Sequence, residues 1–156
     1  MTNVFLISEQ KVREFTSLNN SVDTALIKNC IRTAQDINLQ STIGTVLYEK
    51  LLNDVSNGTL SGDYKTLVDN YIQDFLLYAA YYEILEEVYL RPRNNGLLKP
   101  TGGENSIDVD LETYNVKRQS VENKIAYYND RLTNYILEED GRFPELNQAD
   151  KLYEQG

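Results

Sequence analysis

Residues 75–82 are the part of the chain that most limits its fold, because every one of them is apolar or aromatic. They lie within residues 64–90, where apolar side chains recur at three- and four-residue steps, as on one face of a helix. This spacing predicts one long helix, which would end before Pro92 because proline disfavours helix in the preceding residue. A helix without a polar face is buried on all sides. We therefore expect an all-α fold in which this helix needs cover from other chains.

Other segments carry the same helical periodicity. Residues 21–40 and 42–56 each predict a helix, and we expect Thr42 to cap the second and Gly58 to end it. A last long helix is predicted over residues 110–139 from an apolar stripe that includes Tyr114, Val121 and Leu132. Acidic residues lie at its start, where the helix dipole favours negative charge. Together these segments predict a helical bundle of about four main helices.

Two irregular segments flank the last helix. Residues 91–109 are expected to form a loop of a length that is uncommon inside a compact domain and is usually either functional or disordered. We predict a helical domain over residues 1–139, which includes this loop, and an extended, polar C-terminal tail over residues 140–156. Deleting residues 141–156 should then leave the monomer folded but block assembly. The tail would contact a neighbouring chain through its isolated apolar side chains, which are Phe143, Pro144, Leu146 and Tyr153.

The chain is acidic, with 15 Lys and Arg against 24 Asp and Glu and a net charge of −9. Proteins that bind DNA tightly neutralise its phosphates with clustered basic side chains, so this balance argues against specific DNA binding. It is compatible with DNA that passes along an acidic lining, because such a lining repels phosphate. Arg91 and Arg93 in the long loop are candidates for contact with DNA or with carboxylates of a partner, although two loop arginines also serve ordinary solubility.

Residues that commonly carry enzymatic chemistry are scarce. The chain has no histidine, which removes His-dependent nucleophilic catalysis and imidazole metal sites. Its single cysteine, Cys30, lies on an apolar helical face and is expected in the core, and it cannot form an intrachain disulfide. The acidic cluster at residues 108–112 lacks the spacing and the glycine of a calcium-binding loop. We therefore expect no enzyme, no catalytic residue, no cofactor and no metal.

The N-terminal residues show no targeting or membrane signal. The apolar run at residues 4–7 has no basic residue before it and is too short for a signal segment or a membrane span. Ser8 after it is expected to cap a brief first helix. We expect a soluble protein, made in a cytoplasm, with no membrane partner.

Several short motifs, taken in order, resemble a known family. They are Asn3-Val4-Phe5-Leu6-Ile7-Ser8, Ala34-Gln35-Asp36-Ile37, Thr42-Ile43-Gly44-Thr45-Val46-Leu47-Tyr48-Glu49-Lys50-Leu51, Tyr64 with Leu67, Tyr71-Ile72, Asn94-Asn95-Gly96-Leu97 and Phe143-Pro144-Glu145. Together they resemble the head–tail connector (adaptor) proteins of tailed bacteriophages, in particular the group from phages of Bacteroidota, including crAss-like phages. The resemblance spans nearly the whole chain and rests on the order and spacing of the motifs.

This resemblance implies a structural virion protein with no catalytic residues. It implies a homo-oligomeric ring, commonly of twelve copies, in the phage neck at the head–tail interface, assembled in the host cytoplasm. The ring would dock on the portal protein, meet an adjacent neck or tail protein, and let DNA pass through its lumen without specific binding.

Two other interpretations stay open. The first is a different neck or tail ring protein, a class that tends toward β-rich folds. The second is a soluble helical protein-interaction module that works as a monomer and binds a peptide in a groove.

Overall fold

The computed structural model describes residues 3–16, 18, 21–89 and 111–146. All regular secondary structure within these residues is helical, which confirms the predicted all-α fold. The loop at residues 91–109 and the tail beyond residue 146 lie outside the described residues. The elements are, in order, α1 (Glu9–Phe15), α2 (Thr24–Thr33), η1 (Ala34–Leu39), α3 (Gln40–Ile43), α4 (Thr45–Asn57), α5 (Gly62–Leu67), η2 (Val68–Ile72), α6 (Gln73–Tyr89) and α7 (Leu111–Glu138).

Two of the helical rods contain a π-turn. The segment η1 joins α2 to α3 without a break, and η2 joins α5 to α6 in the same way. Thr42 is not the cap that the sequence predicts, because it lies inside the continuous helix. The break comes at Gly44, whose φ of 84° is a backbone conformation that glycine adopts at little cost. The helix α4 ends at Gly58, which is left-handed with φ 69°, as predicted.

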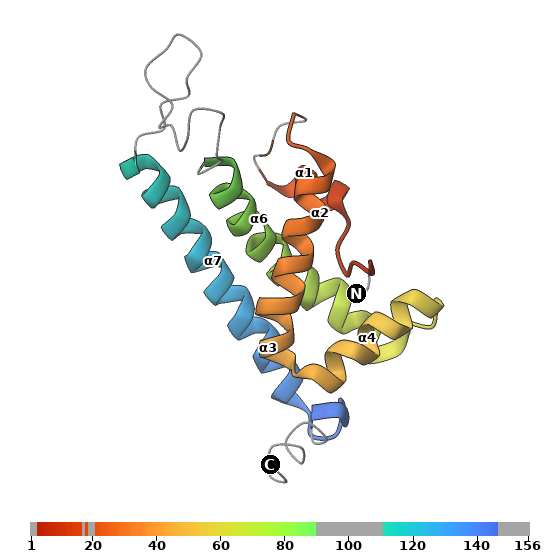
Figure 1. The fold of residues 1–156 in the computed structure, drawn as a ribbon. Helices are drawn as coiled ribbons and strands as arrows, with labels where there is room; N and C mark the ends of the chain where they lie inside the picture. Colours follow the sequence, from red (N-terminus) through yellow and green to blue (C-terminus); the bar gives the residue numbers. More distant parts are fainter. Residues whose placement is uncertain (1–2, 17, 19–20, 90–110, 147–156) are drawn as a thin grey trace, which may run out of the picture.

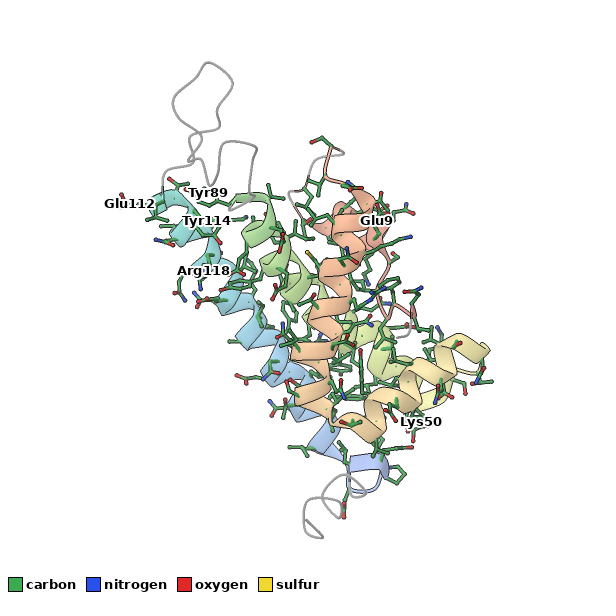
Figure 2. The ribbon with its side chains drawn as sticks, in the orientation of Figure 1. Glu9, Lys50, Tyr89, Glu112, Tyr114 and Arg118 are labelled. Atoms are coloured by element: carbon green, nitrogen blue, oxygen red, sulfur yellow. The ribbon has the colours of Figure 1, made fainter. Side chains whose placement is uncertain are left out.

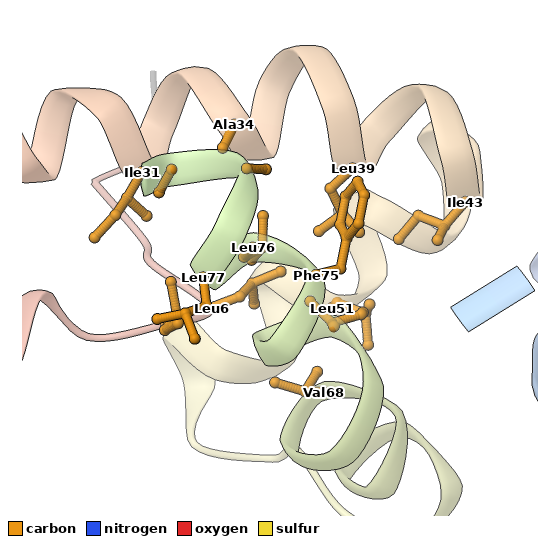
Figure 3. Close-up of a cluster of buried hydrophobic side chains, with 14 of the residues drawn as sticks. Leu6, Ile31, Ala34, Leu39, Ile43, Leu51, Val68, Phe75, Leu76 and Leu77 are labelled. Atoms are coloured by element: carbon orange, nitrogen blue, oxygen red, sulfur yellow. The ribbon is translucent and has the colours of Figure 1, made fainter. Parts of the chain in front are cut away.

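The helix α6 forms the centre of the bundle. It packs against α7 on one side and against α2 and α1 on the other (Figure 1). The helix α4 crosses the end of the bundle where α3 approaches α7 (Figure 1). Figure 3 shows the core at this crossing, where Leu39, Leu51, Val68 and Phe75 come together from four different elements.

The chain itself covers the apolar segment at residues 75–82. Leu76, Ala79 and Ala80 are fully buried, and Phe75, Leu77 and Tyr81 are at most 5% exposed. The two remaining positions, both tyrosines, are half-buried. The expectation that this helix needs a second chain is therefore wrong, because α1, α2 and α7 surround it. Any surface for assembly has to be sought elsewhere on the molecule.

The N-terminal residues cross the bundle before α1 begins, and two glutamine side chains hold them there. The backbone N–H of Leu6 donates to Gln35 Oε1 at 2.6 Å, and Gln35 Nε2 donates to the Val4 carbonyl at 3.0 Å. Gln73 Nε2 donates to the Leu6 carbonyl at 2.9 Å. Gln35 lies in η1 and Gln73 directly follows η2. The two π-turns thus place both amides on the same backbone segment. Ser8 caps α1 by accepting from the Lys11 N–H, as predicted.

Residues 139–146 fold back onto the end of the bundle. Phe143 is 2% exposed and lies edge-on to the rings of Tyr64 and Tyr135. The Tyr64 hydroxyl donates to the Glu145 carboxylate at 2.9 and 3.0 Å. The first part of the predicted tail is therefore held by its own chain.

Candidate interaction surface

Tyrosine side chains form much of the contact that η2 and α6 make with α7. Tyr71 stacks on Tyr135 with ring centroids 4.0 Å apart, and Tyr78 stacks on Tyr128 at 5.3 Å. Both pairs come from positions seven residues apart on each helix, so they lie on facing stripes of two antiparallel helices. At the other end of the contact, Tyr89 stacks on Tyr114 at 4.1 Å (Figure 2). The chain has twelve tyrosines, and these stacked pairs show that half of them pack against one another within the chain.

Basic side chains cover several of these rings. The Arg131 guanidinium lies 4.6 Å from the Tyr71 centroid, and that of Arg142 lies 4.6 Å from the Tyr135 centroid. Arg118 Nε donates to the Tyr82 hydroxyl at 2.6 Å. Burial raises the pKa of Tyr82, although its bond to Arg118 opposes this shift. These cations are engaged within the chain, which leaves less positive charge for DNA phosphates.

The opposite face of α7 carries large apolar side chains that no part of the described chain covers. Val116 is 67% exposed, Tyr127 63% and Leu137 70%. Exposed Asn123 and Asn134 lie between them in sequence. The five positions follow one another at steps of seven, four, seven and three residues, so they share one side of the helix. We call this side the outer face of α7.

A groove of about 820 Å³ lies along the outer face of α7 at its C-terminal half. Its walls combine aromatic rings, one leucine and a few polar groups. One wall comes from η2, because Tyr71 is part of that segment. The lining residues are Tyr71, Tyr127, Asp130, Arg131, Asn134, Tyr135, Leu137 and Glu138.

A second exposed site lies on η1, which packs against α6. Ile37 is 63% exposed, although its neighbours Gln35 and Leu39 are buried. Asp36 beside it is exposed and accepts a hydrogen bond from the Tyr48 hydroxyl at 2.8 Å. We call Asp36 and Ile37 the η1 knob.

The described residues contain little reactive chemistry. Cys30 is buried, as predicted, and burial followed by the nearby Glu87 and Glu83 carboxylates raises its pKa to about 12, so the thiol is protonated and unreactive at neutral pH. No group of three or more His, Cys, Asp or Glu side chains in the described part of the chain could hold a metal ion. Among the helices described, none is both long enough and apolar enough to cross a membrane.

The residues predicted to contact partners differ in how far they are buried in the structure. Phe143 is buried in its own bundle, so it is not available to anchor a tail on a neighbouring chain. Pro144 is exposed and Leu146 is half-buried beside the core. Arg91, Arg93 and Tyr153 lie outside the described residues.

The outer face of α7 is the feature that sequence reasoning missed. The apolar stripe predicted for this helix contains Tyr114, Val121 and Leu132, which are buried, and it leaves out Val116, Tyr127 and Leu137. Those three fall on a second stripe of the same helix. This second apolar stripe was the signal in the sequence that could have identified the surface.

Among known protein families, the family of unknown function DUF6712 matches residues 39–154, which include α3 to α7. No curated protein and no solved structure matches the chain.

Proposed function

The chain belongs to DUF6712, a family of unknown function, and we propose that it is a structural subunit that assembles with its own copies into a ring. In this proposal the ring is the head–tail connector (adaptor) of a tailed bacteriophage. It joins the portal protein to an adjacent neck or tail protein and lets DNA pass through its lumen. The motif resemblance suggests the phage setting, and the structure supports it with an all-α bundle that has a surface suited to assembly.

The outer face of α7 is the single observation that carries the proposal. Isolated exposed apolar residues are normal on a soluble protein, but two large ones, Tyr127 and Leu137, that line one groove on the same face of a helix are typical of a docking surface. Burying one such side chain contributes roughly 1.5–3 kcal/mol. Each contact would therefore be modest, and a closed ring would gain from repeating it around the circle.

The net negative charge of the chain supports the proposal that DNA passes through the ring without being bound. The net charge of −9 disfavours tight DNA binding, and several basic side chains of the described chain are engaged by tyrosine rings or carboxylates. The proposal therefore assigns no specific DNA site, no catalytic residue and no cofactor to this chain. It places the protein in the virion neck, after assembly in the host cytoplasm, without a membrane partner.

A test compares the intact chain with variants of the outer face. Sedimentation over a range of concentrations, and electron microscopy with the portal protein of the same phage, would report self-association and ring formation. We expect Tyr127→Asp and Leu137→Asp to weaken both, and Asn53→Asp, a matched change at an exposed position of α4, to leave both unchanged. A wild-type chain that stays monomeric and forms no ring on portals would contradict the proposal.

The groove also suits a second candidate function, a monomeric helical interaction module that binds a segment of another protein. The same experiment separates the two, because this module would stay monomeric with or without a portal. The remaining alternative, a β-rich neck ring protein, is disfavoured by the all-α fold.

A further inference from the structure

We propose that neighbouring copies meet head to tail, with the η1 knob of one copy docked on Tyr127 and Lys124 of the next. This inference rests on the proposed function, since it names the surface that the outer face of α7 receives. It commits the contact to two different surfaces of the same chain.

The two surfaces lie on different sides of the molecule. The outer face of α7 looks away from α6, whereas η1 lies in the rod that packs on α6 and meets α7 at α3 (Figure 1). When two different surfaces meet, each copy that is added still has its other surface free to bind the next copy. Such a contact closes into a ring when the rotation between copies permits it. A symmetric contact of α7 with α7 would instead end at two copies and leave the η1 knob uncovered.

The two surfaces also lie at a similar level along the bundle. Thr42 Oγ1 donates to Asn129 Oδ1 at 3.1 Å, which aligns α3 with α7. Ile37 precedes Thr42 by five residues and Tyr127 precedes Asn129 by two, and both rods run toward the same end of the molecule (Figure 1). The difference of three residues is about one helical turn, or roughly 5 Å. A rotation about an axis along the bundle therefore brings the surfaces together with little rise.

One exposed charge beside each surface is opposite in sign to the other, and the groove itself also contains the carboxylates of Asp130 and Glu138. Asp36 is exposed next to Ile37, and the described residues offer it no ion pair. Lys124 is exposed one turn before Tyr127. Its ammonium donates to Ser120 Oγ at 3.1 Å and lies 5.9 Å from the Tyr78 centroid, and it too has no ion pair within the described part of the chain. Docking would place the carboxylate near the ammonium, while Ile37 enters the aromatic groove beside Tyr127.

The test mixes two variants that each lose one surface. Tyr127→Asp disables the outer face of α7 and Ile37→Asp disables the η1 knob. Both positions are 63% exposed, so neither change is expected to unfold the chain, which circular dichroism would verify. We expect each variant alone to associate at least about tenfold more weakly than wild type. A mixture should form dimers that stop at two copies, because each partner still supplies one intact surface.

A charge exchange provides an independent check. Lys124→Glu alone should weaken self-association, and Lys124→Glu combined with Asp36→Lys in the same chain should restore it, because every contact then holds the reversed pair. Restoration distinguishes a direct contact from general damage to the fold.

The outcomes separate this inference from the proposed function. Normal assembly of Ile37→Asp, or a mixture that forms no dimers while wild type assembles, would overturn the head-to-tail contact and leave ring formation intact. Absence of wild-type assembly under every condition would overturn both.

Discussion

A single buried amide, Gln35, links the N-terminal segment to the bundle. Its side chain is 2% exposed and satisfies two backbone groups, the N–H of Leu6 and the carbonyl of Val4. A buried polar group costs free energy unless it is paired, so each partner depends on the other. The sequence shows a glutamine on a helical face but no sign that its partner is a backbone thirty residues away.

Replacing Gln35 with leucine should lower the free energy of unfolding by about 1–3 kcal/mol, because the buried Leu6 N–H loses its acceptor. Chemical denaturation would measure the change. The matched control is Gln119→Leu on the exposed side of α7, which should change stability by less than about 0.5 kcal/mol. Equal effects for the two variants would contradict this account of the N-terminal segment.

Tyr64 should make stability depend on alkaline pH. Burial, followed by its hydrogen bond to Glu145, raises its pKa from 10.0 to about 12. Between these values the unfolded chain releases the tyrosine proton and the folded chain keeps it, so the free energy of unfolding falls as pH rises from 10 to 12. We expect Tyr64→Phe to show a smaller fall in denaturation experiments across this range. An identical pH profile would contradict the assigned shift.

At the scale of elements, α7 has two faces with different tasks. The inner face stacks Tyr128 on a tyrosine of α6 and Tyr135 on a tyrosine of η2, and the outer face presents Tyr127 to solvent. Offset and stacked aromatic pairs contribute roughly 0.5–1.5 kcal/mol beyond their buried area. Stability should therefore reside on one face of this helix and association on the other.

Tyr135→Ala should destabilise the monomer by roughly 2–4 kcal/mol, because it removes the ring between Tyr71 and Arg142. Tyr127→Ala should change monomer stability by less than about 0.5 kcal/mol while weakening self-association. Urea denaturation and sedimentation on the same samples would separate the effects. Loss of association in Tyr135→Ala without loss of stability would argue against this division.

The short turn after α7 is part of the bundle, which changes one expectation from the sequence. Phe143→Ala should cost about 3–5 kcal/mol, since it removes a fully packed ring. Deleting residues 141–156 should therefore destabilise the domain, contrary to the prediction that it would leave the domain folded. Thermal unfolding of the truncated chain would decide, and an unchanged melting temperature would restore the original expectation.

At the scale of the whole molecule, periodicity predicted the helical fold and the bounds of the last helix to within one residue, because apolar spacing is a local signal. The π-turns were not predictable, since no local pattern marks them and each places a glutamine against a backbone segment far away along the chain. The burial of Phe143 was missed because it follows a helix as an isolated apolar residue. The sequence did not show that helices of the same chain bury residues 75–82, because the apolar pattern of one helix does not reveal how many neighbouring helices surround it.

We propose that copies of this chain assemble through the outer face of α7. Electron cryomicroscopy of the protein together with the proposed portal partner would show whether they do. We predict a ring in which Tyr127 and Leu137 of each copy are buried against the next copy. A ring whose copies touch elsewhere and leave these side chains facing solvent or DNA would contradict the claim.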